Sequence, residues 1–187
     1  MRKIFSIILI AASLMMLLTA CDKEIAEEEN DSEVLTTLEL HFMERGTQNQ
    51  LVYKFDDPDG FGAGSVAPTV DLIRLLPGKV YDVEVKLLNK TANPIEDVTG
   101  EVEDESADHR FYYLPATGSN ITVDNFNTDV NGMPLGIRST WTTGAKATGS
   151  IRVVLRHYPN GSKAADDPVD SPKSGTDIDT GFSTSVE

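Results

Sequence analysis

The side chains best suited to metal chemistry lie between residues 127 and 138. Asn127, Asp129 and Asn131 place side-chain oxygens at alternate positions, as in the first half of a calcium-binding loop. Gly132 follows at the sixth position of that pattern, but Arg138 stands at the twelfth, where a bidentate glutamate is expected. Because Asn-Gly also favours a tight interstrand turn, a divalent cation and a plain turn remain alternatives here.

A second acidic loop carries Asp56, Asp57 and Asp59 within four residues. Unpaired carboxylates this close repel one another, so a bound cation at Asp57 and Asp59 would relieve that repulsion. The sequence Asp-Pro-Asp-Gly is also a strong turn signal without any ligand. If strand order brings this loop beside the 124–131 loop, their carboxylates will form one negative edge that attracts cations.

An alternative metal pair is Glu105 and His109, four residues apart and on one face of a helix that extends that far. The pattern from Pro94 to about Ala107 predicts such a helix. With Glu101, and with His41 or His157 brought in by the fold, this pair could bind zinc, copper or haem iron. The other interpretation is a solvated acidic helix whose histidine pairs with a glutamate.

No motif in the sequence indicates an enzyme. There is no nucleophile elbow with a Ser-His-Asp order, and no glycine-rich phosphate loop that leads into a helix. We therefore expect a non-enzymatic protein with no cofactor other than a divalent cation.

The negative net charge limits the classes of partner that this chain is able to bind. The formal net charge is −14, and removal of the cations Arg2 and Lys3 with a leader would lower it to −16. Such a chain repels phosphates, so we expect no nucleic-acid partner.

The first 21 residues have the pattern of a secretory signal. Arg2 and Lys3 precede the apolar run Ile4 to Leu18, which is too short for an ordinary transmembrane helix. The run ends in Leu-Thr-Ala before Cys21, which resembles a bacterial lipobox. Cys21 is the only cysteine, so its lipidation with acyl chains such as palmitate would leave no thiol for a disulfide. We predict a signal peptide over residues 1–20 and a lipid anchor on Cys21.

Residues 21–33 are predicted to be an acidic, flexible tether because they are rich in charge and poor in apolar side chains. The order Cys21-Asp22-Lys23-Glu24 and the following glutamates resemble the export signals of Bacteroidota surface lipoproteins. That resemblance implies an outer-membrane anchor facing the cell surface, with a spacer facing the periplasm as the alternative.

Residues 34–187 are predicted to form one mainly β domain. Alternating apolar and polar residues indicate strands near 34–43, 50–55 and 80–88, and apolar runs indicate further strands at 70–76, 111–114, 121–123, 135–142, 150–158 and 178–186. The polar segment 160–176 is predicted to be a mobile loop. Many short strands with one interposed helix favour an immunoglobulin-like antiparallel β-sandwich.

Several motifs resemble those of small Bacteroidota lipoproteins of unassigned function. The shared motifs are Asp57-Pro58-Asp59-Gly60, Asp108-His109-Arg110-Phe111-Tyr112, the stretch Asp129 to Gly136, Thr148-Gly149, Leu155-Arg156-His157 and Thr176-Asp177-Ile178-Asp179. Members of this group often carry the label of a type 1 periplasmic-binding fold, which disagrees with the strand-rich pattern of this chain. The resemblance implies an association with TonB-dependent outer-membrane receptors, and it implies no catalytic residues.

Together these observations predict a membrane-anchored, non-enzymatic binding or accessory module that works with an outer-membrane nutrient transporter. The alternative is a structural or adhesion lipoprotein at the cell surface that contacts other proteins.

Overall fold

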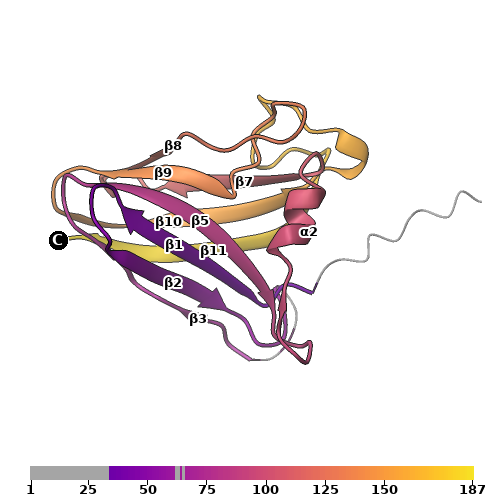
Figure 1. The fold of residues 1–187 in the computed structure, drawn as a ribbon, viewed down its shortest axis with the longest axis horizontal. Helices are drawn as coiled ribbons and strands as arrows, with labels where there is room; N and C mark the ends of the chain where they lie inside the picture. The colour runs from indigo at the N-terminus through magenta and orange to yellow at the C-terminus, as the bar shows by residue number, and fades with distance from the viewer. Residues whose placement is uncertain (1–33, 62–63, 65) are drawn as a thin grey trace, which may run out of the picture. The chain divides into compact units, whose positions relative to one another are not determined.

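Two mainly antiparallel sheets pack face to face in the protein (Figure 1). A computed structural model describes residues 34–61, 64 and 66–187. Cys21, the signal peptide and the tether therefore lie outside the described residues. Within the described residues, the larger sheet has the order β3-β2-β1-β5-β9-β8, with β6 paired to β5, and the smaller sheet has the order β4-β11-β10-β7.

Alternating side chains build the larger sheet from residues far apart in the sequence. In β1, for example, Leu38, Leu40 and Phe42 are buried, and the residues between them, Glu39 and His41, are more exposed. The strands of this sheet are β1 (Thr37–Glu44), β2 (Gln50–Asp56), β3 (Thr69–Val70), β5 (Val80–Asn89), β6 (Glu96–Asp97), β8 (Ile121–Asp124) and β9 (Arg138–Thr143).

The smaller sheet uses the two longest strands of the described chain. Its members are β4 (Ile73–Leu75), β7 (His109–Pro115), β10 (Ala147–His157) and β11 (Gly175–Val186), and a short 3-10 helix, η1 (Pro159–Gly161), follows β10. All of its pairs are antiparallel except β4 with β11. Strand β11 therefore lies inside the sheet, between β4 and β10.

Aromatic side chains from both sheets meet in the core. Trp141 on β9 packs edge-to-face against Phe42 on β1, with ring centroids 5.0 Å apart, and against Tyr113 on β7 at 5.9 Å. Since Tyr113 belongs to the smaller sheet, these contacts join the two layers. The prediction of an immunoglobulin-like, mainly β sandwich with one short interposed helix is confirmed.

Two predicted elements differ in extent. The single strand predicted over residues 70–76 is two strands, because Val70 pairs with β2 in one sheet whereas Ile73–Leu75 pair with β11 in the other. Asp71 ends the first of these strands, and its Oδ2 accepts a hydrogen bond from Lys54 N. The chain therefore changes sheets at residues 71–72.

The helix predicted over residues 94–107 is confined to α2 (Thr99–Asp104). The preceding residues form β6 instead, with Asp97 opposite Leu88 of β5. Thr99 also bonds to β5, since its hydroxyl accepts a hydrogen bond from Leu87 N at 2.8 Å. Pairing with β5 therefore overrides the helix-start signal around Pro94.

The polar segment between β10 and β11, predicted to be a mobile loop over residues 160–176, is attached to the smaller sheet. Arg110 on β7 donates from Nη1 to the carbonyl oxygen of Ala164 at 3.0 Å. Arg156 on β10 donates from Nη2 to the carbonyl oxygen of Ser174 at 2.6 Å. The two arginines donate hydrogen bonds to backbone carbonyl oxygens of the 160–176 segment, and the composition of that segment alone does not reveal these donors.

Candidate functional site

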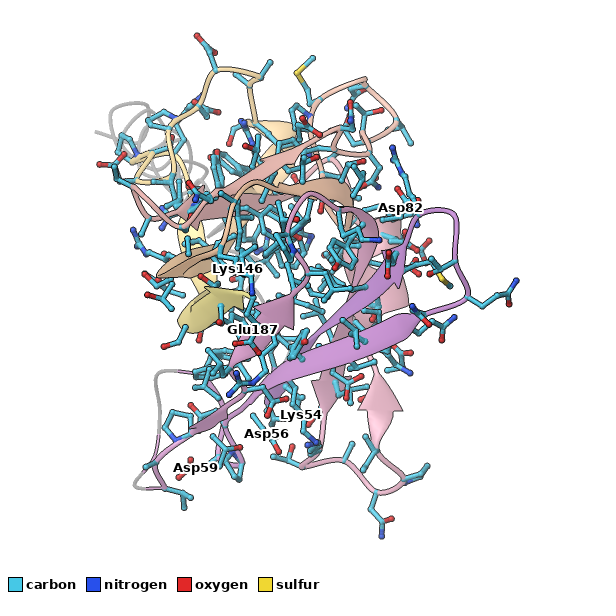
Figure 2. The ribbon with its side chains drawn as sticks, turned by 90° about the vertical axis from the view of Figure 1, so that its left-hand side faces the viewer. Lys54, Asp56, Asp59, Asp82, Lys146 and Glu187 are labelled. Atoms are coloured by element: carbon cyan, nitrogen blue, oxygen red, sulfur yellow. The ribbon has the colours of Figure 1, made fainter. Side chains whose placement is uncertain are left out.

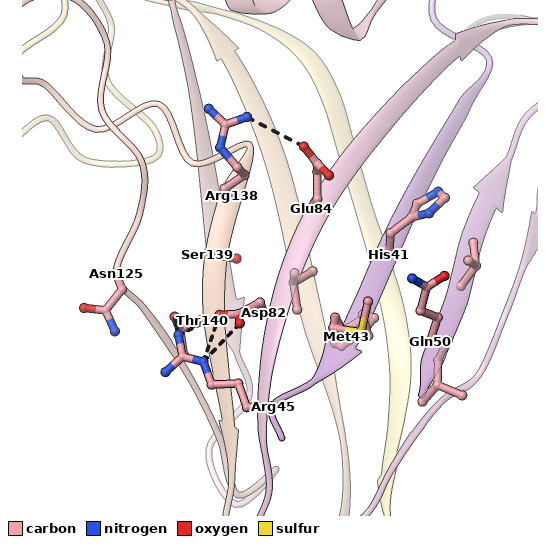
Figure 3. A pocket seen from close by; sticks show the side chains of 14 residues that line it. His41, Met43, Arg45, Gln50, Asp82, Glu84, Asn125, Arg138, Ser139 and Thr140 are labelled. Carbon is pink, nitrogen blue, oxygen red and sulfur yellow. Dashed lines mark hydrogen bonds and ion pairs between the residues drawn. The ribbon is translucent and has the colours of Figure 1, made fainter. Parts of the chain in front are cut away.

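A groove of about 560 Å³ runs over the outer face of the larger sheet (Figure 3). Two rows of outward side chains cross its floor. One row joins His41 on β1 to Glu84 on β5 and Arg138 on β9, and the neighbouring row includes Met43 and Asp82. The groove therefore displays both signs of charge beside a thioether.

Ion pairs hold the charged side chains of this groove in place. Arg45 donates to the Asp82 carboxylate through Nε and Nη2, with a shortest distance of 2.6 Å. The Arg138 Nη1 atom lies 2.7 Å from Glu103 Oε1 and 3.6 Å from Glu84 Oε1. The hydrogen bond from Arg45 lowers the pKa of the Asp82 carboxyl. All three pairs are exposed, so they contribute little stability and are able to exchange with charges on a partner.

The imidazole and the serine hydroxyl in the groove have separate partners. His41 Nε2 lies 2.8 Å from Glu39 Oε2, whereas Ser139 Oγ accepts a hydrogen bond from Trp141 Nε1 at 3.1 Å. Ser139 and Trp141 are buried. His41 is therefore not paired with the serine as a general base would be.

A second candidate site lies in the smaller sheet, where two histidines face each other across neighbouring strands. His109 begins β7 and His157 ends β10, and their backbones are directly paired in the antiparallel register. Their ring centroids are 4.9 Å apart. Both side chains follow the inward face on which Phe111 and Leu155 contribute to the core.

A β-bulge brings Asp177 to the same place. On β11, Ile178 pairs with Leu155 and Thr176 pairs with Arg156, so Asp177 is an extra residue with no partner in β10. Bulges re-aim the side chain of the extra residue. The Asp177 Oδ2 atom lies 3.8 Å from His109 Nε2. Within the described ranges, His109, His157 and Asp177 are the only three His, Cys, Asp or Glu residues grouped closely enough to share a metal ion.

Burial sets the protonation of this cluster. Burial first, and then the neighbouring His157, lower the pKa of His109 to about 4, so its ring is neutral at pH 7. Burial raises the pKa of the Asp177 carboxyl, and nearby His157 and Arg156 oppose that shift. A neutral imidazole and a partly buried carboxylate therefore stand side by side without forming an ion pair.

The sequence pointed to part of this cluster. His109 was predicted as a metal ligand, and His157 was one of two histidines expected to be supplied by the fold; His41, the other, lies in the groove of the larger sheet. Glu105 contributes its carbonyl oxygen, 3.2 Å from His109 Nδ1, and its carboxylate is not part of the group. Asp177 was missed, because its only local signal is an acidic residue directly before the core residue Ile178.

In the predicted calcium-type loop, the side-chain oxygens of Asp129 and Asn127 already accept hydrogen bonds or form an ion pair within the protein. Asp129 Oδ1 accepts from the backbone N–H groups of Asn131 and Met133, both at 2.8 Å. Asp129 Oδ2 lies 2.8 Å from Lys163 Nζ, and both of these side chains are only 1% exposed. The Asn127 side-chain oxygen accepts from Arg138 N. These oxygens therefore already have partners, and a cation bound by Asn127, Asp129 and Asn131 would have to displace them.

The loop with Asp57 and Asp59 forms a tight turn, in which Gly60 N donates to the Asp57 carbonyl oxygen. Burial, followed by the neighbouring Asp59 carboxylate, raises the pKa of the Asp57 carboxyl. Asp59 Oδ2 accepts from Val66 N at 3.1 Å, and Asp56 pairs with Lys90 at 2.8 Å.

The aspartates predicted to form one negative edge do not gather at a shared site. Figure 2 shows Asp56 and Asp59 together, away from Asp82. Asp56 lies opposite Thr37, the first residue of β1. Asp124, from the other predicted loop, pairs with Thr140, which pairs with Asp82, and Asp82 lies opposite Met43 near the other end of β1. In the part of the chain that the structure describes, the one group of three potential metal ligands contains none of the loop aspartates.

No helix among the described residues is both long enough and apolar enough to cross a membrane. No family model, no curated protein and no solved structure matches this chain.

Proposed function

We propose that this chain is a lipid-anchored, non-enzymatic binding module that works beside an outer-membrane nutrient transporter. Its anchor is Cys21, on the grounds of the basic start, the apolar run and the Leu-Thr-Ala-Cys order. The acidic tether, which resembles a surface-export signal, supports a position at the cell surface. A TonB-dependent receptor is the partner class that the sequence resemblance suggests.

The observation that carries the binding role is the groove on the larger sheet. Its floor has cationic and anionic side chains in adjacent rows, among them Arg138, Glu84, Arg45 and Asp82. Exposed pairs of this kind exchange readily with charges on a partner, and they add specificity and association rate more than affinity. The groove therefore suits a polypeptide segment with charges of both signs, such as an exposed loop of a transporter.

The contacts in the groove support binding over catalysis. His41 is held by Glu39, and the Ser139 hydroxyl is held by Trp141. Nucleophilic catalysis requires a base within hydrogen-bond reach of the nucleophile, and these two residues have other partners.

A second candidate function is a structural or adhesion lipoprotein that contacts other proteins. The observation that favours it is a set of exposed apolar side chains between β2 and the turn after β4. Its members are Leu51, Val52, Val66, Val70, Leu72 and Leu76. Exposed apolar side chains are stabilised when a protein partner covers them and removes them from water.

Affinity capture from membranes tests the transporter proposal. The full-length chain with its anchor intact is cross-linked in cells, extracted in detergent and isolated, and its partners are identified by mass spectrometry. We expect Arg138→Glu to lower recovery of the transporter at least about tenfold, because it places like charges beside Glu84 and Glu103 and reverses a groove charge.

The matched control is Arg152→Glu, which reverses an exposed charge on the smaller sheet, where Arg152 pairs with Asp179 at 2.6 Å. It should leave transporter recovery unchanged. Equal recovery with Arg138→Glu and wild type would contradict the groove as the binding surface. Capture of adhesion or envelope proteins in place of a transporter would favour the second candidate function.

A further inference from the structure

We propose that His109, His157 and Asp177 form a binding site for a divalent transition-metal ion of the zinc class. Two imidazole nitrogens and one carboxylate oxygen are a donor set that zinc accepts in proteins. Three protein ligands also leave a fourth position for water or for a ligand carried by the metal. This inference goes beyond the proposed binding role, because the site lies in the smaller sheet and the groove lies on the larger one.

The distances between the donor atoms suit one shared ion. One donor atom from each residue lies within 4.8 Å of the other two, and His109 Nε2 and Asp177 Oδ2 are 3.8 Å apart. Ligands about 2.1 Å from one tetrahedral ion lie roughly 3.4 Å from each other. Movement of the side-chain donor atoms by about 1 Å would therefore bring all three within bonding distance of one ion. His157 and Asp177 are partly exposed, so they have room for this movement and leave a path for the ion.

The His109 ring is already oriented as a metal ligand. Its Nδ1 atom lies 3.2 Å from the Glu105 carbonyl oxygen, and a carbonyl only accepts hydrogen bonds. Nδ1 therefore carries the proton, and the lone pair of Nε2 points to the side of Asp177. A backbone carbonyl that fixes the tautomer in this way is a common outer partner of metal-binding histidines.

Asp177 has a buried side-chain oxygen that accepts no hydrogen bond within the described chain and that a metal ion would bind. Its Oδ2 atom is buried and makes no hydrogen bond to any residue that the structure describes. The two nearby cations are engaged elsewhere: Lys163 pairs with Asp129 at 2.8 Å, and Arg156 donates to Ser174 and to the Thr176 hydroxyl. A buried carboxylate oxygen without a donor is unfavourable, and metal binding removes that cost.

Calorimetric titration tests the site. The full-length chain in detergent is stripped of metal with a chelator, the chelator is removed, and zinc chloride is added. We expect one zinc ion per chain. Asp177→Asn and His157→Gln should each weaken zinc affinity at least about tenfold, since even loss of an outer partner costs 10–100-fold. Zinc should also raise the thermal midpoint of the wild type and not that of these variants.

The matched control is His41→Gln, which removes the remaining histidine of the chain and lies in the groove of the larger sheet. Its zinc affinity should equal that of the wild type. Cobalt chloride adds a structural readout, because four-coordinate cobalt with imidazole ligands absorbs strongly in the visible range. That band should appear in wild type and His41→Gln and be absent from Asp177→Asn.

Any of three results would overturn the site. These are no zinc bound by the wild type, wild-type zinc affinity in both Asp177→Asn and His157→Gln, or a loss of affinity in His41→Gln as large as in those two variants. The two ligand variants change different strands, so a folding defect in one still allows zinc affinity to be measured in the other. The thermal midpoint of each metal-free variant checks its folding. Capture of a transporter through the groove does not depend on any of these outcomes.

Discussion

At the scale of single residues, Lys163 is a buried charge that contacts several segments of the chain. Its Nζ atom contacts Asp129 Oδ2 and also donates to the carbonyl oxygens of Ser106 and His109, at 2.6 and 2.7 Å. Burial lowers the pKa of Lys163 despite its pairing with Asp129. One ammonium group thus holds the segment after β10 against the chain before β7 and against the 125–137 loop.

We expect Asp129→Asn to destabilise the protein by about 3–5 kcal/mol, because it leaves a buried ammonium without its counter-charge. Urea unfolding of both proteins, followed by Trp141 fluorescence, measures this difference. Asp179→Asn is the control: it breaks the exposed pair with Arg152, and its cost should stay below about 1 kcal/mol. Similar costs for the two variants would show that Lys163 does not depend on Asp129.

At the scale of elements, Glu44 joins three segments. It ends β1, its Oε1 lies 2.6 Å from Lys79 Nζ just before β5, and its Oε2 accepts from Asn49 just before β2. The Glu44 side chain is 6% exposed. The hydrogen bonds from Lys79 and then Asn49 lower the pKa of this carboxyl below its ordinary value of 4.5.

This shift predicts a pH dependence of stability. The folded pKa lies below the unfolded pKa, so the stabilisation by Glu44 is present above the unfolded value and is lost as pH falls through the folded value. At about pH 6, Glu44→Gln should therefore have a lower thermal midpoint than wild type. The gap should be smaller at about pH 3, because protonation of Glu44 as the pH falls towards its lowered folded pKa removes this stabilisation. Scanning calorimetry at both pH values checks this, and a gap that does not shrink with pH would contradict it.

Local patterns predicted most strands because burial in a sandwich follows the alternation of side chains. The pattern Val83, Val85, Leu87 gives β5 directly, and all three side chains are buried. The α2 prediction ran too long because its start signal is local, whereas pairing of Asp97 with β5 is not. Asp177 was missed for the same reason: a bulge arises from the register of two strands, and the sequence of one strand does not contain it.

At the scale of the whole molecule, the proposed lipid anchor on Cys21 would decide where the binding surfaces work. Cys21→Ser should move the protein from the membrane fraction to the soluble fraction, because two or more acyl chains hold a protein to a bilayer and their loss releases it. Immunoblots of the two fractions measure this, and the thermal midpoint of the released protein shows that the sandwich is intact. Retention of Cys21→Ser in the membrane fraction would rule out acylation of Cys21 as the anchor.

The position of β11 also constrains the order in which the sandwich forms during synthesis. Val186 pairs with Leu75 of β4 on one side and with Ala147 of β10 on the other. Until residues 175–186 have left the ribosome, β4 has no neighbour and β10 keeps an open edge. The contact between β4 and β11 also spans more than a hundred residues, and contacts this distant in sequence form slowly. The sandwich therefore remains incomplete throughout translation of residues 34–174, and an incompletely folded chain is what the proposed export through a signal peptide requires.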